Sequence, residues 1–143
     1  MKINNILVVC VGNICRSPTA ELLLKQAFPN KQIGSAGVGA LVGKPMDASA
    51  LQLAIDAGLD GRGHVAQQLT ADMAKAADLI LVMEKGHIEA VTSIAPFAMG
   101  KTFLYGKPIG DQAIPDPYRQ SVEAFQHVFQ LLCQATEGWR KFL

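Results

Sequence analysis

Hydrophobic side chains along this chain gather in short runs that alternate with amphipathic segments. Two runs, residues 6–11 and 78–83, consist mainly of aliphatic residues, as in parallel strands that are buried on both faces of a sheet. Shorter strand-like patterns occupy residues 32–38 and 102–104. These four segments predict the strands of one buried sheet.

The segment after the first run has the signals of a helix start. Ser17 is expected to cap the helix, Pro18 to occupy its first position and Glu21 to lie in its first turn. Negative charge is favoured there because the helix dipole places its positive end at the N-terminus. The helix is expected to continue to Phe28, before the helix-breaking Pro29.

Further helices are predicted downstream. Asp47 is expected to cap a helix over residues 48–57. Thr70 is expected to begin a short helical turn, and another helix is expected around residues 87–94. In the last segment, apolar residues recur at helical spacing and predict one buried helix face, formed by Val122, Phe125, Phe129, Leu132 and Trp139.

The order of these elements predicts the fold class. Parallel strands need crossover connections, and a helix between two strands provides one. We therefore expect an α/β fold, a three-layer α/β/α sandwich whose central parallel sheet has about four strands and helices on both faces. The length of 143 residues is that of one domain, so residues 1–143 are expected to form a single domain.

Composition narrows the class of protein. The 13 basic and 12 acidic residues give a net charge of +1, which provides no electrostatic surface for nucleic acid. No stretch approaches the roughly 20 apolar residues that cross a bilayer, so membrane insertion is not expected. The 3 cysteines are too few for a disulfide framework, which favours the cytoplasm. Cysteines and histidines are not spaced as metal ligands, so no metal is expected, and His87 and His127 are interpreted as exposed helix residues.

The candidate chemistry is concentrated in residues 10–17. Cys10 ends the first strand, a short loop follows, and Arg16 stands at the entrance of the helix. Such a loop can curl around a tetrahedral anion with its N–H groups inward, and Gly12 and Asn13 tolerate the positive φ that the curl requires. The guanidinium of Arg16 can grip two oxygens of the anion. The expected phosphate-binding residues are Val11, Gly12, Asn13, Ile14, Cys15, Arg16 and Ser17.

Cys10 is the candidate nucleophile. The loop N–H groups, the helix N-terminus and Arg16 all favour its thiolate. A thiolate that faces a bound phosphoryl group is ready to attack, and the Ser17 hydroxyl can donate a hydrogen bond to the sulfur when it leaves. Asp116 lies in a stiff, proline-rich segment, residues 114–118, and is the candidate proton donor to the departing oxygen. The alternative interpretation of this segment is a plain turn.

Residues 9–18 read Val-Cys-Val-Gly-Asn-Ile-Cys-Arg-Ser-Pro and contain a Cys-x5-Arg-Ser signature near the start of the chain. This string resembles that of the low-molecular-weight protein tyrosine phosphatases, and the resemblance covers essentially the whole chain. It implies hydrolysis of phosphotyrosine in two steps through a phosphocysteine, without metal or cofactor. Cys10 would be the nucleophile, Arg16 a phosphate ligand, and Asp116, in an Asp-Pro-Tyr motif, the general acid.

The same resemblance implies supporting roles. Asn13 in the loop would be held by hydrogen bonds from Ser35 and His64, although these two could equally be ordinary satisfied polar residues. Leu41 and Tyr118 would form walls beside the ring of the substrate.

The cysteines other than the candidate nucleophile have separate interpretations. In the family that this chain resembles, the pair corresponding to Cys10 and Cys15 can form a reversible disulfide that protects the nucleophile from over-oxidation. Whether it forms here depends on the geometry of the loop. Cys133 lies in the last predicted helix and is interpreted as buried and inert.

Within that family the chain is most similar to a bacterial subgroup, as judged from residues 4–10, 35–44 and 114–119. Members of the subgroup dephosphorylate the tyrosine-rich tail of a membrane tyrosine autokinase that controls capsule and exopolysaccharide export. Such a phosphotyrosine protein is therefore the expected partner. One alternative is a thioredoxin-linked arsenate reductase, which would need two further cysteines close together. The other is a phosphotyrosine- or anion-binding module without catalysis, which would be expected to lack Cys10 or Asp116.

Overall fold

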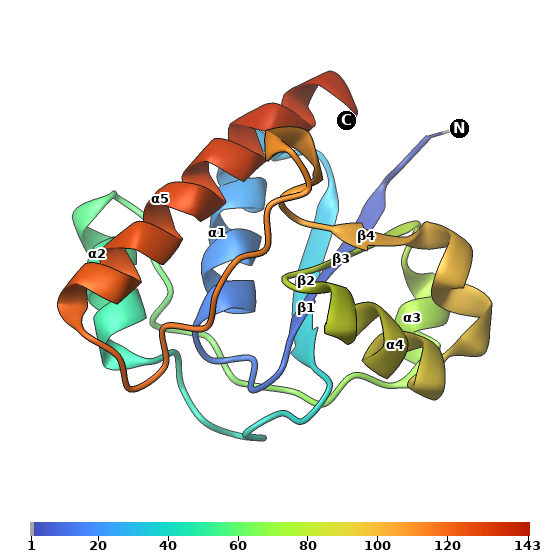
Figure 1. The fold of residues 1–143 in the computed structure, drawn as a ribbon, viewed down its shortest axis with the longest axis horizontal. Helices are drawn as coiled ribbons and strands as arrows, with labels where there is room; N and C mark the ends of the chain where they lie inside the picture. The colour runs from blue at the N-terminus through green and yellow to red at the C-terminus, as the bar shows by residue number, and fades with distance from the viewer. Residues whose placement is uncertain (1) are drawn as a thin grey trace.

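Four parallel strands form a single sheet in the order β2-β1-β3-β4 in the computed structural model, which describes residues 2–143 (Figure 1). The strands are β1 (Asn5–Cys10), β2 (Gln32–Gly37), β3 (Leu79–Val82) and β4 (Thr102–Leu104). β1 pairs with β2 along its whole length, from Asn5 opposite Gln32 to Cys10 opposite Gly37. The predicted parallel sheet is confirmed.

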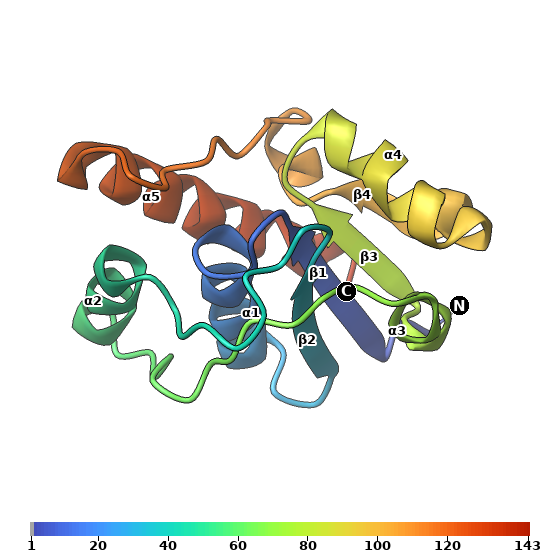
Figure 2. The same ribbon diagram turned by 90° about the horizontal axis from the view of Figure 1, so that it is seen from below.

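Helices cover both faces of this sheet (Figure 2). On one face lie α1 (Arg16–Ala27), α2 (Ala48–Asp56) and α5 (Val122–Gly138), and on the other lie α3 (Ala71–Ala76) and α4 (Lys85–Ile94). Short 3-10 helices follow α4 and β4 and end the chain, as η1 (Pro96–Lys101), η2 (Lys107–Ile109) and η3 (Trp139–Lys141). The predicted three-layer α/β/α architecture is therefore confirmed. Within residues 2–143, no helix is both long enough and apolar enough to cross a bilayer.

The alternation of side chains along β1 divides the core into two parts. Ile6, Val8 and Cys10 belong to the cluster that includes buried residues of α1 and α5. Leu7 and Val9 point to the opposite face and join the cluster beneath α3 and α4. The side chain of Cys10, the candidate nucleophile, therefore lies on the face of the sheet that α1 covers.

The start of α1 differs from the prediction. Helix α1 begins at Arg16 with Cys15 at the N-cap position, so Ser17 lies inside the first turn instead of capping it. The physical reason is that the Ser17 hydroxyl contacts the sulfur of Cys10, at 2.9 Å, and is not available to a backbone N–H. Pro18 is the third helical residue, where its missing N–H costs nothing, and Glu21 lies beyond the first turn.

The next two predicted helix starts are confirmed. The carboxylate of Asp47 accepts hydrogen bonds from the N–H groups of Ser49 and Ala50 at the start of α2. The hydroxyl of Thr70 accepts one from the N–H of Met73 at the start of α3.

Two predictions about burial on helices are wrong. Val122 is 61% exposed, because it begins α5 ahead of the part that packs on the core, and Val128 takes its place in the buried face. His87 is only 8% exposed, because the first turn of α4 faces the sheet edge where Arg16 and Glu84 meet. His127 is exposed on α5, as expected.

Candidate active site

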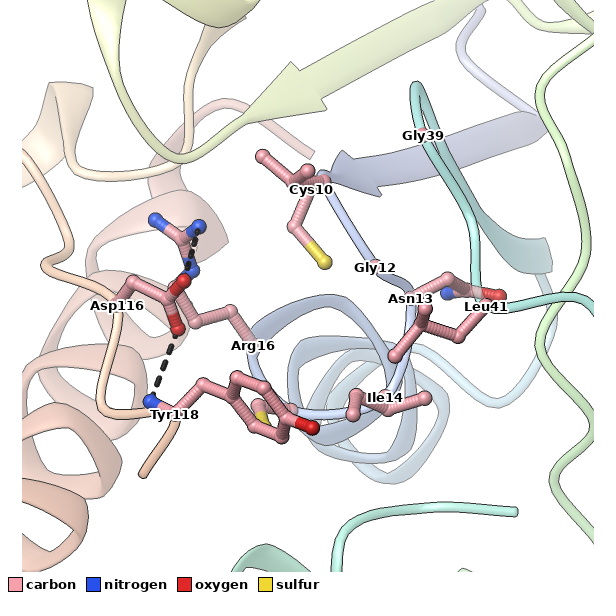
Figure 3. Close-up of a pocket in the computed structure, with 11 residues that line it drawn as sticks. Cys10, Gly12, Asn13, Ile14, Arg16, Gly39, Leu41, Asp116 and Tyr118 are labelled. Atoms are coloured by element: carbon pink, nitrogen blue, oxygen red, sulfur yellow. Dashed lines mark hydrogen bonds and ion pairs between the residues drawn. The ribbon is translucent and has the colours of Figure 1, made fainter. Parts of the chain in front are cut away.

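The carboxyl end of β1 opens into a pocket of about 210 Å³ (Figure 3). It is lined by Cys10, Val11, Gly12, Asn13, Ile14, Cys15, Arg16, Gly39, Leu41, Asp116 and Tyr118. Three segments far apart in the sequence meet here: the loop between β1 and α1, the loop after β2, and the segment before α5. This is the edge of a parallel sheet where ligands are commonly bound.

The backbone of the loop after β1 is turned so that its carbonyl groups point away from the pocket. Each carbonyl of residues 10–14 contacts a group behind the loop: Val38 N to Cys10 O (3.0 Å), Gly39 N to Val11 O (3.0 Å), Leu41 N to Gly12 O (3.0 Å), His64 Nε2 to Asn13 O (2.6 Å) and Asp47 N to Ile14 O (2.8 Å). The N–H groups of residues 12–15 donate no hydrogen bond to any other part of residues 2–143. A loop with its carbonyls directed outward presents its N–H groups inward, which is the arrangement that binds an anion.

A close approach at Gly37 and a positive φ at Asn13 shape the loop. Gly37 ends β2 against the loop, and a Cβ atom there would lie 2.2 Å from the carbonyl oxygen of Val11. Only glycine permits this close approach. Asn13 has a φ of 60°, as expected for a tight curl, whereas the predicted positive φ at Gly12 is wrong. Within the loop, the positive φ therefore falls on Asn13. The hydrogen bonds of its side chain explain why.

A chain of hydrogen bonds runs from Asn13 to the sulfur of Cys10. The Nδ2 group of Asn13 donates to the hydroxyl oxygens of both Ser17 (2.8 Å) and Ser35 (3.0 Å). The Ser35 hydroxyl in turn donates to Glu21 Oε1, at 2.5 Å. Because the oxygen of Ser17 accepts from Asn13, its own hydrogen is free to be donated to the Cys10 sulfur, 2.9 Å away. In this direction the sulfur of Cys10 accepts a hydrogen bond from the Ser17 hydroxyl.

Asn13 is fixed from its other side by the segment that precedes α3. Its Oδ1 accepts a hydrogen bond from the N–H of Gln67, at 2.9 Å, and its carbonyl contacts His64 Nε2. Ser35 and His64 therefore both contact Asn13 directly, where the resemblance placed them. Asn13 is therefore anchored through both its side-chain amide and its backbone carbonyl.

Arg16 is buried behind the pocket with 2% of its side chain exposed. Its Nη1 donates to Glu84 Oε2 (2.8 Å) and to the carbonyl oxygen of Ile114 (2.9 Å). Its Nη2 lies 3.7 Å from Asp116 Oδ2. One nitrogen of the guanidinium is thus held by the protein, and the group lines the pocket where an anion would lie.

Asp116 and Tyr118 line the same pocket (Figure 3). The carboxylate of Asp116 is 51% exposed, and its Oδ1 accepts a hydrogen bond from the N–H of Tyr118, at 3.0 Å. The guanidinium of Arg119 lies 5.2 Å from the centre of the Tyr118 ring, within the range of a cation–π contact. Leu41 and Tyr118 both line the pocket, and their role as walls beside a substrate ring stays a prediction from the resemblance.

Residues 5–143 match the family described as low molecular weight phosphotyrosine protein phosphatase. The chain belongs to this family. Etp of Escherichia coli K12, a low molecular weight protein-tyrosine-phosphatase, is 50% identical over 143 residues, 100% of this chain and 97% of Etp. AmsI of Erwinia amylovora, named as a probable phosphatase of this kind, is 53% identical over 137 residues, 96% of this chain and 95% of AmsI. The structure of Vibrio vulnificus Wzb in complex with benzylphosphonate has a TM-score of 0.97 and 54% identity, covering 99% of this chain and 100% of that one.

The other two cysteines of this phosphatase have thiols with raised pKa values. Burial, followed by the charges of Asp47 and Asp116, raises the pKa of the Cys15 thiol far above its ordinary value. Cys15 and Cys10 line the same pocket and are both free thiols. Cys133 is partly buried, not fully as predicted, and desolvation raises its pKa as well.

Sequence reasoning missed three residues that hold the phosphatase loop. Glu84 follows β3 at the sheet edge where the site lies, and its place after a buried strand is a signal that could have identified it. Glu21 was assigned to the helix dipole but accepts the hydrogen bond of Ser35 instead. Gln67 contacts Asn13 through its backbone N–H, so its side chain carries no signal of this role.

Proposed function

We propose that this chain hydrolyses phosphotyrosine in proteins through a covalent phosphocysteine on Cys10. The observation that supports this most is the loop of residues 10–16, with its carbonyls turned outward, its free N–H groups and the buried Arg16, which lines the same pocket as Cys10. Family membership of residues 5–143 gives the same activity. The loop amides and Arg16 would bind the three terminal oxygens of the phosphoryl group and stabilise their charge in the transition state.

In the first step the Cys10 thiolate attacks phosphorus. The S–P bond forms while the bond from phosphorus to the tyrosine oxygen breaks. Asp116, protonated at this point, gives its proton to the leaving oxygen, so tyrosine departs as a neutral phenol. The position of Asp116 at the pocket mouth suits this role, because the leaving group points outward when the phosphoryl group occupies the loop.

In the second step water attacks the phosphocysteine. Asp116, now ionised, takes a proton from the water as the new P–O bond forms. The S–P bond breaks and Cys10 leaves as a thiolate, which the Ser17 hydroxyl stabilises from 2.9 Å. Inorganic phosphate then dissociates, and Asp116 holds the proton needed for the next cycle.

Selection for tyrosine follows from the depth of the site. Cys10 is only 3% exposed, whereas Leu41 and Tyr118 line the pocket and are 42% and 36% exposed. A phosphotyrosine ring is long enough to lie between these two side chains while its phosphate reaches the loop. A phosphoserine side chain is shorter and would bring its peptide backbone against the rim.

The proposed partner is the tyrosine-rich tail of a membrane tyrosine autokinase that controls capsule or exopolysaccharide production. This proposal is supported by the likeness to the bacterial subgroup, whose members act on such tails, and by the identity with Etp and AmsI. It places the site of action in the cytoplasm, where that tail is phosphorylated.

A single assay series tests the function. We expect hydrolysis of para-nitrophenyl phosphate and of a phosphotyrosine peptide from such a tail, in EDTA, with inhibition by orthovanadate. A phosphoserine peptide of the same sequence is the matched control and should be a poor substrate. No hydrolysis by freshly reduced protein would contradict the proposal, and arsenate reduction would then be the next activity to measure. Equal rates on both peptides would contradict the selection for tyrosine.

A further inference from the structure

His87 is a buried histidine that the proposed reaction does not use. It is the third residue of α4 and lies close behind the site, with 8% of its surface exposed. Its Nε2 lies 3.3 Å from Glu84 Oε2. Its Nδ1 is fully covered and has no hydrogen-bond partner within residues 2–143.

The oxygen that His87 contacts is the one that holds Arg16. Glu84 Oε2 accepts the hydrogen bond from Arg16 Nη1, at 2.8 Å, and lies 3.3 Å from His87 Nε2. The carboxylate of Glu84 is 44% exposed, so without a second contact it could rotate into water. Arg16 Nη1 would then keep only the neutral carbonyl of Ile114.

The surroundings of the ring decide which nitrogen carries its proton. A buried N–H without an acceptor is rare in proteins, whereas a buried nitrogen lone pair without a donor is less costly. Nε2 faces a carboxylate and Nδ1 faces no acceptor, so the proton belongs on Nε2. Burial and the charge of Arg16 lower the pKa of His87, against the opposing charges of Glu84 and Asp116, which favours the neutral ring.

We propose that His87 is a positioning residue for the phosphate-binding arginine. Its neutral ring donates a hydrogen bond from Nε2 to Glu84. This bond keeps the Glu84 carboxylate in contact with Arg16, and Glu84 in turn keeps the Arg16 guanidinium in its place in the pocket. The kinetic consequence rests on the proposed function, because it requires Arg16 to bind the phosphoryl group. The contact itself does not depend on that function and can be observed without substrate.

Two substitutions at His87 separate positioning from packing. His87→Leu fills the space without a donor, whereas His87→Gln places a side-chain N–H at a similar reach from the backbone. We expect His87→Leu to lower kcat for para-nitrophenyl phosphate and to weaken inhibition by inorganic phosphate, each by about tenfold, the usual effect of losing a hydrogen bond to a charged group. His87→Gln should restore both to within about threefold. His127→Leu, on the exposed side of α5, is the control and should leave both values unchanged.

A kinetic result that would overturn the proposal is an equal loss of activity in His87→Leu and His87→Gln. Wild-type kcat in a folded His87→Leu protein would overturn it as well. In a Glu84→Ala background, His87→Leu should cost little more, because the acceptor that links His87 to Arg16 is already gone.

Nitrogen NMR of the imidazole tests the contact separately from activity. In the wild-type protein at neutral pH, we expect the chemical shifts of His87 to show a protonated Nε2 and an unprotonated Nδ1. A proton on Nδ1 would overturn the proposal even if the enzyme is active. If the wild-type protein hydrolyses no phosphate ester, the proposed function fails, and the NMR result still decides whether His87 donates to Glu84.

Discussion

At the scale of single residues, the direction of each hydrogen bond matters as much as its presence. The Nδ2 group of Asn13 is a donor to the Ser17 oxygen, so the hydroxyl hydrogen of Ser17 is left for the sulfur of Cys10. Asn13 adopts a φ of 60° that places this amide between Ser17 and Ser35. One asparagine therefore contributes both to the shape of the loop and to the direction of the hydrogen bond between Ser17 and the Cys10 sulfur.

Asp116 provides a residue-scale prediction about the leaving group. Asp116→Asn keeps the size of the side chain but removes the proton that the proposed mechanism requires it to donate. We expect hydrolysis of phenyl phosphate, a poor leaving group, to fall by about 10²–10³-fold, and hydrolysis of para-nitrophenyl phosphate to fall much less. The ratio of the two kcat/KM values in wild-type and variant enzyme measures this effect.

A structural role for Asp116 would give a different pattern. The carboxylate also accepts a hydrogen bond from the N–H of Tyr118, which an asparagine side-chain oxygen can still accept. Equal losses on both substrates would show that Asp116 only shapes the loop, and would contradict its assignment as general acid.

At the scale of elements, the end of β2 is what holds the phosphate loop from behind. The N–H groups of Val38 and Gly39 donate to the carbonyls of Cys10 and Val11, which continues the pairing of β1 with β2 past the last strand residue. Gly37 permits this because it has no Cβ.

Gly37→Ala is therefore expected to be costly. The added Cβ would lie 2.2 Å from the carbonyl oxygen of Val11, so the backbone of the loop must shift. We expect the free energy of unfolding to fall by about 1–3 kcal/mol and the activity to fall with it. Urea denaturation followed by circular dichroism measures the first, and para-nitrophenyl phosphate hydrolysis the second.

Gly12→Ala is the matched control for stability. A Cβ at Gly12 would meet Leu41 and Ile14 at 3.7 Å and 3.8 Å, which are ordinary contacts, and its φ is not positive. Its free energy of unfolding should therefore stay within about 0.5 kcal/mol of the wild type. A loss as large as that of Gly37→Ala would show that the approach of β2 is not the cause.

The distinction between local and long-range order explains what the sequence could predict. The strand, loop and helix around Cys10 are contiguous, so Arg16 and the loop residues are predicted as one candidate site from the residue types of a single local segment. Arg16 meets Glu84 because β3 lies beside β1 in the sheet, and strand order is not encoded in any local pattern. The burial of His87 follows from the same neighbourhood and was missed for the same reason.

At the scale of the whole molecule, His87 links the site to the stability of the fold. Its pKa in the folded state lies below its ordinary value of 6.5, mainly because of burial. As the pH falls below 6.5, the unfolded chain binds a proton at His87 that the folded protein does not bind. The free energy of unfolding should therefore decrease over this interval, until the pH reaches the folded pKa.

The comparison with His87→Gln isolates this contribution. Glutamine does not titrate, so the difference in the free energy of unfolding between wild type and variant should change with pH, to the disadvantage of the wild type in acid. Urea denaturation of both proteins at a series of pH values between about 7 and 4.5 measures it. Parallel curves would show that the ring titrates equally in both states.

The measurement that tests the central claim most directly is capture of the covalent intermediate. Wild-type protein is mixed with phosphorus-labelled phosphotyrosine peptide, stopped within milliseconds, digested, and the labelled residue is located by mass spectrometry. We predict a phosphoryl group on the sulfur of Cys10, no label in Cys10→Ser, and loss of turnover in that variant with phosphate binding retained. Label on another residue, or substantial turnover in Cys10→Ser, would contradict the account.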